Sequence, residues 1–154
     1  MTLYDPILVG LLLEHLARCR KQADHLEYSL RRARDATPLS DEERLERYEA
    51  LTSRFARLQD MLVAPFKTIA MLEFEPDKAE RIPDLLSLME KLAILPQVRD
   101  WLEIRKTRNA IAHEYSECPE RMAELIDRVR RQSRILIAAL GRAERYADKA
   151  RRVG

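Results

Sequence analysis

Apolar residues recur at spacings of three and four positions along most of this 154-residue chain. That spacing places them on one side of an α-helix, which has about 3.6 residues per turn. The chain has only three glycines, and it shows neither alternating runs of β-branched residues nor an Asn-Gly or Asp-Gly hairpin turn. The pattern therefore predicts an all-α protein, an antiparallel bundle of four to five helices in which each helix buries one stripe.

Prolines and capping residues divide the pattern into segments. Ser40 followed by Glu43 is a capping box that starts the second helix, and Pro119 opens the last one. Pro65 lies inside the second helix and is expected to kink it, because proline lacks the amide hydrogen of a helical residue. The helices expected are about 6–34, from 40 to about 72, about 82–92, from about 97, and from 119. No repeat or linker separates them, so the prediction is one domain over residues 1–154.

The apolar stripes also predict which side chains form the core. We assign Trp101 and the methionines to packing, and we expect His15 to be a core residue with its polar atoms satisfied. His15 belongs to the stripe of the first helix, which reads Leu8, Leu12, His15, Cys19, Ala23, Leu26 and Leu30.

Two cysteines, Cys19 and Cys118, are too few for a disulfide framework, which favours a reducing cytoplasm. The apolar run at residues 7–13 is short and has no positive residue before it, so we expect neither a signal peptide nor a membrane span. No cofactor or metal is expected. The chain has no glycine-rich phosphate loop, and one cysteine with one nearby histidine makes no metal site.

Charge is unevenly distributed although the net charge is only +2. Residues 73–90 carry six acidic residues against two basic ones, and residues 119–154 carry ten basic residues against five acidic ones. Two interpretations of the basic C-terminal third stay open: it holds a polyanion, or it is a solvated helix face. In the first case the arginines of the last helix would hold a phosphate backbone without reading its sequence, and they are Arg121, Arg128, Arg130, Arg131 and Arg134.

The segment 101–115 carries the residues best suited to chemistry. Arg108 falls on an apolar stripe with Trp101, and a cation there is costly unless it meets a carboxylate or lines a site. Asn109 and His113 are four residues apart, so the amide can hydrogen-bond the imidazole and orient it. Histidine also gives and takes a proton near neutral pH. A cation, an orienting amide and a titratable imidazole together suit phosphodiester cleavage.

The spacing of Arg and His alone carries little weight in a chain so rich in arginine. Arg20 and His25 have the same spacing with nothing else in support, and we expect both to be surface residues. The longer string Arg108-Asn109-x-x-x-His113-x-Tyr115, near the end of a helix, is more specific. It resembles the HEPN superfamily and within it the HepT-like group, whose hallmark is Arg, a polar residue, three variable residues and His, with a Tyr two residues further on.

The resemblance implies a HEPN-like bundle and a metal-independent endoribonuclease that acts as a dimer or a higher assembly of dimers. It implies the toxin of a type VII-like toxin–antitoxin system, whose partner, a minimal nucleotidyltransferase, transfers AMP to Tyr115 and silences the toxin. In this interpretation His113 is the general acid or base, Arg108 holds the phosphate and Asn109 assists. The residues expected to contact the RNA substrate are Arg105, Lys106, Arg121, Arg128 and Arg131.

A second function class stays open. The chain would then be a non-catalytic helical module, a docking or substrate-binding subunit of a nucleotidyltransferase. Both alternatives keep the bundle and the dimer, and RNA cleavage by the purified, unmodified protein separates them.

Overall fold

The computed structural model describes residues 4–35, 37–113 and 119–153, with the backbone alone for His113 and Pro119. Within these ranges the chain forms five α-helices and one short 3-10 helix, and it forms no β-strand. The all-α prediction is therefore confirmed. The elements are α1 (Pro6–Arg34), α2 (Asp41–Leu72), η1 (Pro76–Ala79), α3 (Ile82–Lys91), α4 (Val98–His113) and α5 (Pro119–Val153).

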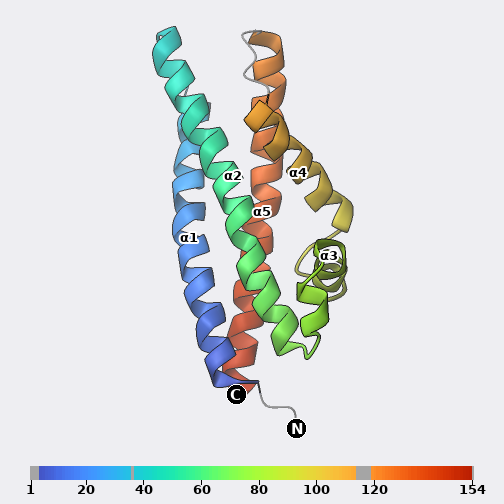
Figure 1. Cartoon of the computed structure of the whole chain (residues 1–154). Coiled ribbons are helices and arrows are strands. Elements are labelled where there is room, and N and C mark those ends of the chain that lie inside the picture. The colour runs from blue at the N-terminus through green and yellow to red at the C-terminus, as the bar shows by residue number, and fades with distance from the viewer. Residues whose placement is uncertain (1–3, 36, 114–118, 154) are drawn as a thin grey trace.

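Three long helices, α1, α2 and α5, lie side by side along the molecule, and α3 and α4 lie on one side of them (Figure 1). Helix α1 runs antiparallel to both α2 and α5 (Figure 1). Helices α2 and α5 run in the same direction, because the chain returns through α3 and α4 between them (Figure 1). The expectation of antiparallel packing is thus wrong for this one pair. None of the helices described is both long enough and apolar enough to span a membrane.

The starts of α1 and α2 follow from local chemistry. The Asp5 carboxylate accepts a hydrogen bond from the Ile7 amide at 2.8 Å, which caps α1, and proline occupies the first position of that helix. The Ser40 hydroxyl accepts a hydrogen bond from the Glu43 amide at 3.2 Å and donates one to the Glu43 carboxylate at 3.1 Å. The capping box predicted at Ser40 is therefore confirmed.

Helices α2 and α3 end in the same backbone motif. Phe74 and Ala93 have φ angles of 60° and 58°, in the left-handed region. After α2, the Glu75 amide donates to the Ala70 carbonyl at 2.9 Å, and after α3 the Ile94 amide donates to the Met89 carbonyl at 2.9 Å. These are Schellman caps, in which glycine usually takes the left-handed position. Here a phenylalanine and an alanine take it instead.

Pro65 lies buried within α2, and the helix continues through it to Leu72. Because Pro65 has no amide hydrogen, it cannot donate to the carbonyl of Met61 four residues earlier. The Cys19 thiol, from α1, donates to that carbonyl across a sulfur–oxygen distance of 3.6 Å. The proline thus leaves an acceptor that a side chain of the neighbouring helix satisfies.

The core draws buried side chains from all five α-helices. Trp101 is 1% exposed and its ring centre lies 5.3 Å from that of Phe66, so its assignment to packing is confirmed. His15 is half-buried, and its neighbour Leu16 takes the core position instead. The prediction for His15 was wrong because Leu16 also fits between Leu12 and Cys19 at helical spacing, and the apolar side chain of Leu16 takes the buried position. The methionines are mixed, since Met89 is fully buried but Met71 is 44% exposed.

Candidate functional site

Helix α4 carries the motif, and its buried side holds it against the bundle. The helix starts where the Val98 amide donates to the Glu90 carboxylate of α3 at 2.6 Å. Trp101, Ile104 and Thr107 are buried beneath it. Positions 102, 106, 109 and 113 follow one another at spacings of four, three and four, so they share the outer face of the helix.

Arg108 points to α2, where it forms a two-point ion pair with Asp60. Its Nη2 atom lies 3.0 Å from Asp60 Oδ2, and its Nε atom lies 3.3 Å from Asp60 Oδ1. The two side chains remain 34% and 54% exposed. The hydrogen bond and the negative charge of Asp60 raise the pKa of the Arg108 guanidinium, so it carries its charge throughout the ordinary pH range.

Arg108 also lines an open hollow between α2 and α4. The expectation that it meets a carboxylate is confirmed, and its role in a site stays a prediction. Arg105 lies one turn before Arg108 in the same wall, and Asn109 follows it. The Gln59 side chain is 5% exposed, and its carbonyl oxygen has no hydrogen-bond partner in the described part of the chain. The hollow is lined by Gln59, Asp60, Val63, Ile82, Trp101, Arg105, Arg108 and Asn109.

The arrangement offers two cations, two side-chain amides and a carboxylate at one opening. A phosphate placed here would bind to Arg105 directly, and it would compete with Asp60 for Arg108. Asp60 and Gln59 are 49 and 50 positions from Asn109 in the sequence, and no sequence pattern marks them. The position of Arg108 on an apolar stripe did indicate that a carboxylate would meet it, although not which one.

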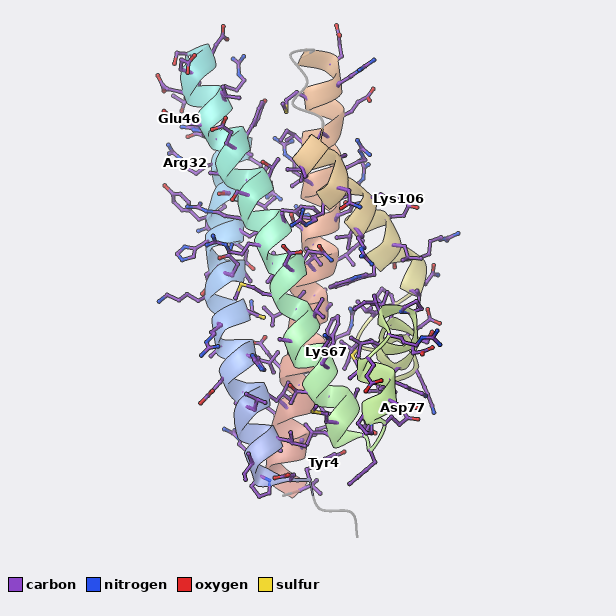
Figure 2. All side chains as sticks on the ribbon, viewed as in Figure 1. Tyr4, Arg32, Glu46, Lys67, Asp77 and Lys106 are labelled. Carbon is purple, nitrogen blue, oxygen red and sulfur yellow. The ribbon has the colours of Figure 1, made fainter. Side chains whose placement is uncertain are left out.

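The other predicted motif residues are only partly described. Position 113 is the last residue of α4, while the His113 side chain and Tyr115 lie outside the described residues. The hydrogen bond between Asn109 and His113 therefore stays a prediction. Lys106 lies on the outer side of α4 (Figure 2), away from the hollow, and forms an ion pair with Glu103 at 3.1 Å.

The predicted basic residues of α5 separate into two groups. Arg121, Arg128 and Arg131 are exposed, as a role in RNA binding requires. Arg130 instead donates to the Ala33 carbonyl at the end of α1 at 2.9 Å and lies 3.7 Å from Asp127. Arg130 therefore ties α5 to the last turn of α1, and we remove it from the residues expected to hold a phosphate backbone.

The pair with the same spacing, Arg20 and His25, also behaves differently from expectation. His25 is exposed, as predicted. Arg20 is half-buried and joins α1 to α5, with its Nε atom donating to Glu144 at 3.1 Å and a second, shorter contact to the same carboxylate. Arg20 was wrongly placed on the free surface, because an ion pair between residues distant in sequence leaves no local pattern.

Among the described residues, no group of three or more His, Cys, Asp and Glu side chains is placed to hold a metal ion. Comparison with known proteins gave no matching family model, no matching curated protein and no matching solved structure.

Proposed function

We propose that this chain is a HEPN-like endoribonuclease of the HepT-like kind, the toxin of a toxin–antitoxin pair, acting in the cytoplasm without a metal. One observation carries the proposal. The motif residues Arg108 and Asn109 line an open hollow together with Arg105, on a helix whose last residue is position 113. The resemblance itself rests on the string Arg108-Asn109-x-x-x-His113-x-Tyr115.

In the proposed reaction the ribose 2′-oxygen attacks the neighbouring phosphorus, and the bond from phosphorus to the 5′-oxygen breaks. His113 takes the proton of the 2′-hydroxyl or gives one to the leaving 5′-oxygen. Arg108 exchanges Asp60 for the phosphate and stabilises the charge that builds on it. The products are a 2′,3′-cyclic phosphate and a 5′-hydroxyl.

The helical register supports a shared site in a dimer. Five residues turn an α-helix through about 140°, so Arg108 and position 113 lie on different sides of α4. A second protomer related by a two-fold axis would supply a further copy of each group to one cleft. Transfer of AMP to Tyr115 by a nucleotidyltransferase partner would then close that cleft with bulk and negative charge.

Cleavage of RNA by the purified, unmodified protein tests this proposal. We expect His113→Ala and Arg108→Ala each to lower the rate by about a hundred- to ten-thousand-fold, while circular dichroism shows the same helix content. His25→Ala is the matched control, since that histidine is exposed, and its rate should equal that of the wild type. Full activity of His113→Ala would refute the ribonuclease proposal.

One observation favours the alternative, a non-catalytic docking subunit. Asp60 accepts two hydrogen bonds from Arg108, so a structural ion pair alone would account for this arginine. A docking subunit would bind the nucleotidyltransferase with unchanged affinity after His113→Ala and would cleave no RNA in any form.

A further inference from the structure

A second hollow lies between α1 and α5, on the other flank of α5 from the helix that carries the motif. Arg31 and Arg34 of α1 and Arg134 of α5 line it, together with a single carboxylate, that of Glu27. Leu30, Ile137 and Ala138 complete its wall with apolar surface. Helices α1 and α5 lie side by side (Figure 1), so arginines from two helices line one opening.

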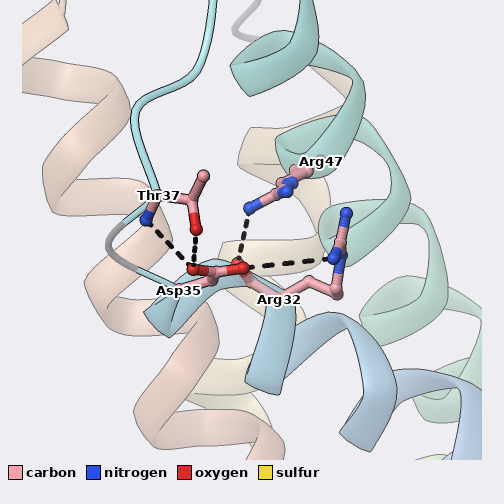
Figure 3. A network of polar contacts seen from close by, with 4 residues as sticks. All are labelled: Arg32, Asp35, Thr37 and Arg47. Atoms are coloured by element: carbon pink, nitrogen blue, oxygen red, sulfur yellow. Dashed lines mark hydrogen bonds and ion pairs between the residues drawn. The ribbon is translucent and has the colours of Figure 1, made fainter.

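These three arginines form no ion pair with any carboxylate in the part of the chain that the structure describes. All three are exposed. Two arginines near the end of α1, by contrast, do meet a carboxylate. Figure 3 shows Arg32 and Arg47 directed at Asp35, which also accepts hydrogen bonds from Thr37.

The dipole of α1 explains only part of this cluster. Arg31 and Arg34 lie in the last turn of that helix, where its negative end favours cations. Arg134 lies near the middle of α5, far from either end of that helix, so the dipole gives no reason for it. Three cations beside one carboxylate repel one another unless an anion lies between them.

Further exposed arginines follow one another along α5 from this hollow, so the basic residues form a row and do not surround a single position. Arg128 and Arg131 are exposed and precede Arg134 at intervals of three residues, so each is the neighbour of the next on the helix surface. Arg121 is two turns earlier. From position 121 to position 134 the helix rises about 20 Å. A line of this length fits an extended polyanion better than an isolated ion.

We propose that the hollow formed by Arg31, Arg34 and Arg134 is a phosphate-binding site for the backbone of single-stranded RNA, which reaches it along Arg128 and Arg131. The site is separate from the hollow that Arg108 lines, and it holds the strand without reading its bases. The choice of RNA rests on the proposed function, while the binding of a polyphosphate strand does not.

Binding of a 2′-O-methyl RNA oligonucleotide to the full chain tests the site. Such a strand has no free 2′-hydroxyl, so it stays intact whether or not the protein is a nuclease. The variant Arg31→Gln/Arg34→Gln/Arg134→Gln should bind more weakly. The slope of log K against log salt should become less steep by about two, since each lost contact to a single strand contributes about 0.7.

The matched control removes the same charge from other places, as Arg18→Gln/Arg57→Gln/Arg81→Gln. These arginines are exposed and do not line the hollow, so the salt slope should stay that of the wild type. Equal changes of slope in both triple variants would overturn the site in favour of a diffuse effect of net charge. Preferential binding of the wild type to anionic lipid vesicles would overturn the assignment to RNA. If the wild-type protein binds the 2′-O-methyl strand but cleaves no unmodified RNA, the proposed function is refuted and this site still stands.

Discussion

Arg108 forms an ion pair with a carboxylate of its own chain, and in the proposed function it exchanges that partner for the phosphate of a substrate. The ion pair with Asp60 is partly exposed on both sides. Pairs of this kind contribute only about 0–1 kcal/mol to stability, because water screens them. A loss of activity in an Arg108 variant, which the proposed function predicts, should therefore not result from a loss of stability.

Two substitutions that break the same ion pair separate these roles. Arg108→Ala and Asp60→Ala should each lower the free energy of unfolding by at most about 1 kcal/mol, measured by urea denaturation. Only Arg108→Ala should abolish RNA cleavage, because Asp60→Ala leaves the cation in place and removes its competitor. Equal loss of activity in both variants would mean that the ion pair, and not the contact to substrate, is what the reaction needs.

Cys19 is a residue whose proton matters to the fold. Burial, and secondarily the negative charge of Glu144, raise the pKa of its thiol to about 11 from an ordinary value of 9.0. The folded protein therefore holds this proton more tightly than the unfolded chain does. The stabilisation is complete below pH 9 and is lost as the pH rises from about 9 to about 11.

Urea denaturation at a series of alkaline pH values measures this loss. Cys19→Ala should be less stable than the wild type at pH 7, since it removes the donor to Met61 and leaves a small cavity. Between pH 9 and 11 its stability should fall less steeply, because the thiol no longer titrates. Parallel curves for the two proteins would show that Cys19 does not carry the alkaline dependence.

At the scale of the element, two helices end on residues that are poorly suited to the conformation they adopt. Phe74 and Ala93 are both exposed and both left-handed. A side chain at such a position costs about 1 kcal/mol relative to glycine. The caps are maintained because their hydrogen bonds satisfy carbonyls that the helix ends leave open.

Replacing these residues with glycine should therefore stabilise the protein. Phe74→Gly and Ala93→Gly should each raise the free energy of unfolding by about 0.5–1 kcal/mol, measured by thermal or urea denaturation. Ala17→Gly is the control and should lower the free energy of unfolding. Ala17 is exposed in the interior of α1, where glycine costs about 1 kcal/mol relative to alanine. Destabilisation by all three substitutions would contradict this account of the caps.

Element starts were predictable from sequence where the chemistry is local. Asp and Ser caps and prolines mark the beginnings of α1, α2 and α5. The ends at Phe74 and Ala93 were not predictable, since the glycine that usually signals a left-handed cap is missing. The partners of Arg108 and Arg20 lie 48 and 124 residues away, and periodicity says which face a helix buries but not against which neighbour.

At the scale of the whole molecule, the outer face of α4 is open to a second copy. Leu102 is 45% exposed and lies two turns before Asn109 on that face. In the proposed dimer the site is shared between two protomers, and the exposed Leu102 would then lie at the two-fold interface.

Light scattering at micromolar concentration tests this arrangement. We expect a dimer, or a higher assembly of dimers, for the wild type and a monomer for Leu102→Glu, because the new charges would meet near the two-fold axis. Ile7→Glu is the control, since Ile7 is 81% exposed but lies at the start of α1. A monomeric wild type, or a dimer that tolerates Leu102→Glu, would argue against an interface through α4.

Helices α3 and α4 lie against one side of the three long helices, which contact one another (Figure 1). The long helices can therefore persist while the lateral pair opens, since cooperative units of a protein often unfold separately. Opening would separate Arg108 from Asp60, because they belong to different units. The amide protons of α4 would then exchange with solvent faster than those of α1, and the motif would belong to the least protected part of the molecule.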